Sequence, residues 1–245
     1  MDTDDRPIGR ILTRREAVTL LGSVGALAFF GRMPRGSGPA AIRANPCVVR
    51  PAMTPGPYYV DERLERSDIR SDPTDGTVKP GALLVLTMSV ASIAGNGCAP
   101  LSGALVDIWQ CDAEGVYSDA VDPKYFDTTG RRFLRGYQRT DRNGVATFTT
   151  IYPGWYPTRT PHIHYKIRSP ASAERPYEFV SQLYFDEGTS DRIYARPPYD
   201  GRGKRTVSNL TDRIYRNSGG RQSMLAVTTA GEGYAAGFDV ALDLA

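Results

Sequence analysis

Both histidines of the 245-residue chain lie in one short segment, His162-Ile163-His164. Polar and apolar residues alternate through this segment, which is typical of a β-strand whose side chains point in turn to its two faces. His162 and His164 would then share one face, while Ile163, Tyr165 and Ile167 would share the other. Two imidazoles that project together from a strand can act as a pair of ligands for a transition-metal ion. The alternative is a pair of unconnected surface or core histidines.

Two tyrosines can approach the same place. The chain turns at Pro153-Gly154 and returns to His162 six residues after Tyr156, so the Tyr156 phenol can reach the imidazoles. A second segment, residues 106–118, runs from a predicted strand into a turn that leads to Tyr117, whose phenol can approach the same place. A phenol has a pKa of about 10, and only a strongly Lewis-acidic cation makes its phenolate form favourable at neutral pH. Two tyrosines with two histidines therefore indicate Fe(III) rather than zinc, copper or ferrous iron.

Four segments, in this order, resemble the intradiol ring-cleavage dioxygenase family. They are TPGPYY at 54–59, GALVDIWQCDAEGVYS at 103–118, FLRGYQRTDRNGVATFTTIYPGWYPTRTPHIHYKI at 133–167 and FVSQLYFD at 179–186. The resemblance implies a β-sandwich enzyme with non-haem Fe(III). It also implies an oxidoreductase that incorporates both atoms of O2 into a catecholic aromatic and yields a cis,cis-muconate-type diacid.

The resemblance also implies a role for each matched residue. The iron ligands of the family match Tyr117, Tyr156, His162 and His164. Tyr156 matches the ligand that leaves the iron when the substrate binds. Arg159 matches an arginine that stabilises negative charge developing on the bound catecholate, and Gln182 matches a glutamine that lines the ring pocket.

The elements that must hold these residues are mostly strands. Period-two alternation predicts seven strands, at residues 83–91, 104–110, 145–151, 162–168, 178–185, 224–229 and 237–242. Short strands separated by turn residues favour an antiparallel β-sandwich, so we expect one all-β domain over residues 47–245. Long loops are expected at 111–140 and 186–222, with one short helical turn at 190–194, and loops of that length are often functional.

The N-terminal segment 1–44 differs from the rest of the chain. It holds seven Arg and four acidic residues, so the remaining chain carries 23 basic and 23 acidic residues. The net charge of +3 therefore belongs to this segment, and a neutral domain argues against a nucleic-acid partner. Arg14 and Arg15 precede an apolar run at 17–30, which is shorter than the roughly 20 residues of a membrane span.

This architecture resembles a twin-arginine export signal, with a core helix or a membrane anchor as the alternatives. The signal predicts a periplasmic or extracellular protein with no stable membrane span after signal removal.

The cysteine and histidine counts exclude other classes. Two His and three Cys are too few for a multi-finger zinc protein or a disulfide-dense mini-fold. Cys98 and Cys111 flank one predicted strand, which holds their Cα atoms too far apart for a disulfide. A disulfide would therefore join Cys47 to one of the other two, and three free thiols are the alternative.

A second class of function competes with the enzyme. The domain could be a non-catalytic secreted β-sandwich binding module, which would be colourless and contain no metal after purification. For the enzyme, the expected partners are a small catecholic substrate and O2. The sequence does not choose among catechol, protocatechuate and hydroxyquinol, and it leaves the oligomeric state open.

Overall fold

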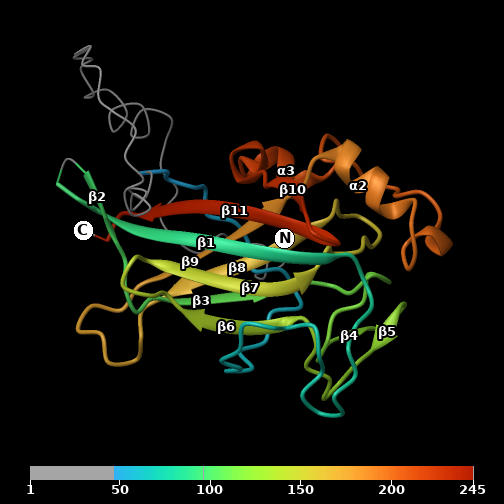
Figure 1. Cartoon of the computed structure of the whole chain (residues 1–245), viewed down its shortest axis with the longest axis horizontal. Helices are drawn as coiled ribbons and strands as arrows, with labels where there is room; N and C mark the ends of the chain where they lie inside the picture. The colour runs from blue at the N-terminus through green and yellow to red at the C-terminus, as the bar shows by residue number, and fades with distance from the viewer. Residues whose placement is uncertain (1–46, 96, 245) are drawn as a thin grey trace.

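The computed structural model describes residues 47–95 and 97–244, so the export signal expected within 1–44 lies outside the described residues. Two sheets form the framework of the described chain, and a two-stranded ribbon joins β4 (Val121–Asp122) to β5 (Phe126–Asp127). In Figure 1 the long strands β1 and β11 cross the middle of the molecule, and the helices lie to one side of them. The expected all-β architecture is confirmed.

The larger sheet has five strands. Its members are β1 (Leu83–Ala94), β2 (Gly97–Pro100), β7 (Val145–Ile151), β10 (Ala226–Ala230) and β11 (Gly233–Leu242). β1 lies at the centre and pairs with β11 on one side and with β2 and β7 on the other. The β1–β11 pair is parallel, which differs from the purely antiparallel sandwich that the sequence predicted. These two strands lie at opposite ends of the domain sequence, so no tight turn dictates their direction.

The smaller sheet has four antiparallel strands in the order β6-β3-β8-β9. They are β3 (Leu105–Trp109), β6 (Arg135–Arg139), β8 (His162–Arg168) and β9 (Glu178–Tyr184). β8 contains both histidines and lies between β3 and β9. Its neighbours therefore decide which side chains meet the imidazoles.

Alternating residues of the two sheets form the core. Leu84, Leu86 and Met88 of β1 are fully buried and belong to the same apolar cluster as Ile163 and Ile167 of β8. The odd-numbered side chains of β8 thus face the sandwich interior, as the alternation predicted. The even-numbered side chains, including both histidines, project from the outer face of the smaller sheet.

The two expected loops contain more secondary structure than the sequence pattern predicted. Residues 111–140 include β4, β5 and β6. Residues 186–222 include α2 (Glu187–Tyr194), η2 (Asp200–Arg202), α3 (Arg213–Asn217) and most of η3 (Gly220–Ser223), where only a turn at 190–194 was expected. These elements are short, and local side-chain contacts rather than apolar periodicity define them. The carboxylates of Asp186 and Asp212, for example, cap the N-termini of α2 and α3.

One disulfide joins Cys47 to Cys98, with 5.4 Å between their Cα atoms. Cys111 is a buried free thiol. The pairing is one of the two that the sequence left open, and the excluded Cys98–Cys111 pair is absent from the described residues. The bond ties the first described residue to β2, at the edge of the larger sheet. No helix among the described residues is long and apolar enough to cross a membrane.

Loss of this disulfide should destabilise the fold. The cysteines are separated by 51 positions, and the crosslink restricts the unfolded chain. Substitution of both cysteines, C47S/C98S, should lower the free energy of unfolding by about 2–4 kcal/mol, as measured by urea denaturation. A reducing agent should destabilise the wild type to a similar extent and leave the double variant unchanged. Equal stability of oxidised and reduced wild type would contradict the prediction.

Candidate active site

Strand register on the outer face of the smaller sheet determines which side chains meet. Trp109 of β3 lies opposite His164 of β8, and His164 lies opposite Gln182 of β9. His162, two residues before His164 on β8, lies opposite Tyr184 of β9. Directly opposed side chains on one face are in contact range. The Trp109 indole stacks on the His164 imidazole, with 4.9 Å between ring centroids, and both residues are buried.

Four atoms that can donate a lone pair to a metal ion, two imidazole nitrogens and two phenol oxygens, lie close together on this face of the smaller sheet. Nε2 of His162 lies 3.0 Å from Nε2 of His164. The same His162 atom lies 3.3 Å from the Tyr156 hydroxyl and 3.5 Å from the Tyr117 hydroxyl. Tyr117 arrives from the segment after β3, and Tyr156 arrives from the segment after β7. The structure thus brings together the two imidazoles and two phenols that the sequence expected to meet.

Hydrogen bonding fixes the direction of the His162 lone pair. Nδ1 of His162 lies 2.7 Å from the carbonyl oxygen of Thr160, so the ring donates its N–H there and keeps its lone pair on Nε2. Burial and the Arg159 cation lower the pKa of His162 to about 3. Burial is also the largest cause that lowers the pKa of His164 well below its ordinary value. Both imidazoles are therefore neutral at pH 7, which is the form that binds metal ions.

The two phenols differ in exposure. Tyr117 is fully buried, whereas Tyr156 is partly exposed. Burial raises the pKa of Tyr117 well above its ordinary value, and it raises the pKa of Tyr156 to about 12 against the opposing effect of Arg159. Each phenol oxygen therefore keeps its proton at pH 7 unless a cation binds it.

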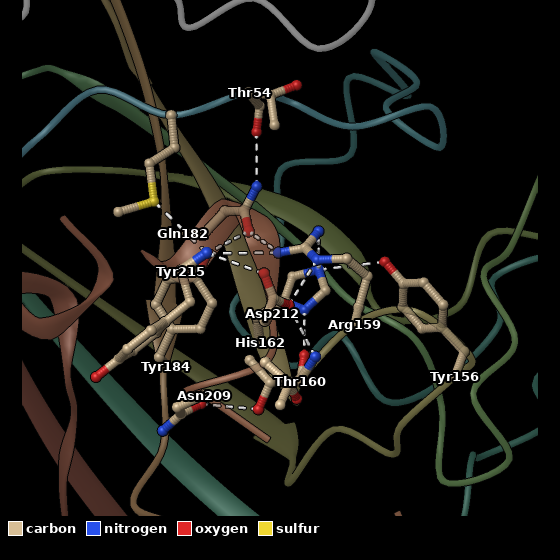
Figure 2. A network of polar contacts seen from close by, with 12 residues as sticks. Thr54, Tyr156, Arg159, Thr160, His162, Gln182, Tyr184, Asn209, Asp212 and Tyr215 are labelled. Atoms are coloured by element: carbon tan, nitrogen blue, oxygen red, sulfur yellow. Dashed lines mark hydrogen bonds and ion pairs between the residues drawn. The ribbon is translucent and has the colours of Figure 1, made fainter. Parts of the chain in front are cut away.

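Arg159 lies at the centre of a polar network beside the donor cluster (Figure 2). Its Nε donates to Oδ2 of Asp212 at 2.8 Å, and its Nη2 donates to Oε1 of Gln182 at 2.6 Å. Its Nη1 lies 3.4 Å from Nε2 of His162. The Gln182 amide is itself held, because its Nε2 donates to the Thr54 carbonyl at 2.9 Å. The guanidinium is therefore held at Nε and Nη2, and its Nη1 faces His162.

A tight turn places Tyr156 and Arg159 next to each other. The Arg159 N–H donates to the Tyr156 carbonyl at 3.4 Å, and the intervening Thr158 has φ of 78°. A positive φ is unfavourable for a β-branched residue and is maintained only where the surroundings impose it. The turn thus holds a cation and a phenol on the same side of the chain.

A cavity of about 610 Å³ opens beside the cluster. Tyr156 and Arg159 line this cavity, together with an aromatic wall of Tyr58, Tyr125 and Phe126. The other lining residues are Thr54, Gly56, Pro57, Glu114, Gly115, Val116, Asp122, Pro157, Thr158, Arg202, Arg213 and Ile214.

The Gln182 side chain lies beside Arg159. The family resemblance predicted that Gln182 lines the ring pocket, and this role stays a prediction; the described residues that line the cavity do not include Gln182. Its side chain is fully buried and contacts Arg159 from behind. It can therefore affect the cavity through the position of Arg159.

The segment 54–59 covers the imidazoles. Gly56 has φ of 72°, and a Cβ at this position would lie 3.1 Å from Cε1 of His164. Only glycine combines that backbone conformation with so close an approach. Tyr58 packs on Tyr117, with 4.9 Å between ring centroids. The TPGPYY motif therefore closes the site over His164 and Tyr117.

No group of three His, Cys, Asp or Glu side chains in residues 47–95 and 97–244 could hold a metal ion. The cluster described above is of another kind, because two of its four donors are phenol oxygens.

The model of the family described as "Dioxygenase" matches residues 54–198, more than half of the chain. The solved structure of an intradiol ring-cleavage dioxygenase from Tetranychus urticae is 33% identical and superimposes with a TM-score of 0.71, over 80% of this chain and 95% of that chain. The chain belongs to the intradiol ring-cleavage dioxygenase family.

Two further relatives of this dioxygenase agree with the assignment. The protocatechuate 3,4-dioxygenase beta chain of Burkholderia cepacia is 30% identical over 191 residues, which cover 75% of this chain and 74% of that protein. The dioxygenase domain of a dioxygenase–carbohydrate-binding protein fusion from Streptomyces sp. SirexAA-E is 30% identical. It has a TM-score of 0.56 and covers 80% of this chain and 99% of that domain. The dioxygenase is thus an oxidoreductase of catechol-type aromatic compounds.

Several residues of this dioxygenase site were not identified from sequence. Arg202, Arg213 and Ile214 line the cavity, and Asp212 pairs with Arg159. All four lie beyond residue 198, where the family match ends. An acidic residue before a helical stretch is a helix-cap signal, so the start of α3 could have been recognised. No sequence signal relates Asp212 to an arginine 53 positions earlier.

The depressed imidazole pKa values predict a pH-dependent stability for this dioxygenase when chelation has removed any metal. An unfolded imidazole has a pKa of about 6.5, whereas that of folded His162 is about 3. Below pH 6.5 the unfolded state therefore binds more protons, and stability falls towards acid by up to about 1.4 kcal/mol per pH unit for each imidazole. Well above pH 6.5, where the unfolded imidazoles are also neutral, these two groups contribute no pH dependence.

The comparison uses the double variant H162N/H164N, which lacks both titrating groups. Urea midpoints measured between pH 7.5 and 4.5 should fall more steeply for the wild type than for this variant. Parallel pH profiles would contradict the prediction.

Proposed function

We propose that this dioxygenase uses ferric iron, held by Tyr117, Tyr156, His162 and His164, to cleave a catecholic ring between its two hydroxylated carbons with O2. The product would be a cis,cis-muconate-type diacid. The convergence of two neutral imidazole nitrogens and two phenol oxygens beside a cavity carries this proposal. The names of the relatives, protocatechuate 3,4-dioxygenase and catechol 1,2-dioxygenase, support a catechol-type substrate.

The donor set fits ferric iron. Nitrogen and oxygen ligands bind a first-row metal ion at about 2.0–2.2 Å, which leaves neighbouring donor atoms roughly 3 Å apart. The separations from His162 Nε2 to its three partners, 3.0, 3.3 and 3.5 Å, agree with that spacing. A strongly Lewis-acidic cation is also what two buried phenols with raised pKa values need in order to lose their protons.

Iron, when bound there, would draw electron density from a coordinated catecholate ring and thereby make the ring reactive towards O2. The residues of the chain have their own tasks. Tyr156 lines the cavity, so its phenolate oxygen can accept a proton from an incoming catechol hydroxyl. Tyr117 is fully buried and would remain a ligand throughout.

Arg159 supplies positive charge at the cavity wall. Burial lowers the pKa of Arg159, but the neighbouring acidic and phenol groups raise it by more. The net shift is upward, so Arg159 stays protonated. A fixed cation next to the substrate stabilises negative charge that develops on the ring during reaction. Gln182 holds Nη2 of Arg159 and keeps the guanidinium from rotating.

We further propose that the protein is exported through a twin-arginine-type signal within 1–44. The Cys47–Cys98 disulfide supports this, because disulfides persist in oxidising compartments.

The direct test measures oxygen uptake, product absorbance and bound iron together. The purified chain should contain stoichiometric iron, show the visible absorption of ferric tyrosinate, and consume O2 with at least one of catechol, protocatechuate or hydroxyquinol. Removal of iron by a chelator should abolish uptake, and Fe(III) should restore it. Zinc in place of iron, or an iron-replete protein inactive with every catechol, would overturn the proposal.

The proton-accepting role of Tyr156 predicts a loss of turnover. Tyr156→Phe should lower kcat per bound iron by about 10²-fold, which is typical for the removal of a general base. Tyr137→Phe is the matched control, because the Tyr137 hydroxyl contacts Glu65 away from the cavity. Stopped-flow and steady-state assays should find the control close to wild type. Equal kcat values for the Tyr156 variant and the control would contradict the assigned role.

A further inference from the structure

Asp212 is a fully buried carboxylate that contacts both the site and the start of α3. Its Oδ2 accepts from Nε of Arg159 at 2.8 Å and from the backbone N–H of Thr160 at 2.8 Å. Its Oδ1 accepts from the backbone N–H of Tyr215 at 2.9 Å, which caps α3. One side chain thus joins α3 to the segment that precedes β8 (Figure 2).

The ion pair constrains the arginine from the side opposite the donor cluster. Asp212 binds Nε and Gln182 binds Nη2, so Nη1 is the nitrogen that faces His162. A guanidinium held at two of its nitrogens has little rotational freedom left. The position of the Arg159 charge relative to the cavity is therefore set by these two partners together.

Asp212 is also linked to His162 through the backbone of Thr160. Asp212 accepts the backbone N–H of Thr160, and the carbonyl of Thr160 accepts the Nδ1–H of the His162 ring. Residues that orient a metal-binding imidazole in this way typically affect metal affinity or activity by 10–100-fold. The next two residues of α3, Arg213 and Ile214, line the cavity. Asp212 thus connects the cavity wall, the cation and one imidazole.

Helix capping alone does not require this carboxylate. Asn or Ser caps a helix about as well as Asp, and a buried charge is costly unless it is paired. Asp186 caps α2 in the same way but is exposed and contacts only residues of its own helix. Burial of a charge at position 212 is therefore explained by its pairing with Arg159.

We propose that Asp212 is a positioning residue of this dioxygenase, which holds the Arg159 guanidinium at the cavity wall for ring cleavage. The inference rests on the proposed function, because it presumes that Arg159 acts on the bound substrate. It assigns part of the reaction to the segment after residue 198, which the family match does not cover.

The test compares Asp212→Asn with Asp186→Asn, each a helix cap that loses its charge. Both variants should retain iron and the visible absorption of the wild type. Asp212→Asn should lower kcat per bound iron by about 10–100-fold, with a much smaller change in KM, because the charge stabilises the reacting ring more than the bound one. Asp186→Asn should leave both constants unchanged. Asp212→Glu, which keeps the charge, should recover part of the lost kcat.

A double-variant cycle separates positioning from general structure. Asparagine keeps an oxygen that can accept the Thr160 N–H, so Asp212→Asn leaves the link to His162 in place and removes the charge that pairs with Arg159. If Asp212 acts through Arg159, adding Asp212→Asn to Arg159→Ala should therefore cause no further loss of kcat. Asp212→Ser, which also caps a helix, serves as the second variant if the Asn protein does not fold. An Asp212 variant as active as the Asp186 control, or losses that multiply in the double variant, would overturn the inference. An unaffected Arg159→Ala enzyme would instead show that the proposed role of Arg159 is wrong.

Discussion

Two neutral imidazoles are buried with their Nε2 atoms 3.0 Å apart on the outer face of a β-sheet. Polar atoms in such a place are stable only if they are paired or bind a cation. Because His162 uses its N–H on Thr160, its lone pair is committed to the shared space between the rings. Much of the surrounding structure serves to cover this face and to supply the remaining donors.

That cover comes from distant parts of the sequence. Gly56, in the segment 54–59, lies against His164, while Tyr117 and Tyr156 come from two different loops. The C-terminal segment adds Asp212, which holds Arg159 from behind. The sandwich is thus a rigid base, and the chemistry depends on loops that meet over one of its outer faces. Chain segments far apart in sequence must fold correctly before the donor set is complete.

The sequence predicted the parts of this arrangement that follow from local periodicity. Alternation around His162 and His164 indicated that both share one strand face, and the strand at 145–151 agrees with β7 at both ends. The meeting of Tyr117 with the histidines followed from a strand–turn pattern together with the family resemblance.

Other parts depend on contacts that no local pattern encodes. β6 has the sequence RGYQR, in which Arg135 is buried and Gly136 packs against Ile69, so apolar alternation is lost. The parallel pairing of β1 with β11 joins strands from opposite ends of the domain. Likewise, the sequence around Asp212 indicates only that this residue caps a helix, because its ion-pair partner Arg159 lies 53 positions earlier.

In the proposed site, one ferric ion is bound by two imidazoles and two phenols. Anomalous diffraction from crystals of the purified chain, measured on both sides of the iron absorption edge, would locate and identify this ion. A single strong anomalous peak should lie within bonding distance of His162, His164, Tyr117 and Tyr156, and it should weaken sharply below the edge. A peak elsewhere in the molecule, or a peak at these residues whose height does not change across the iron edge and therefore marks another metal, would contradict ferric iron at this site.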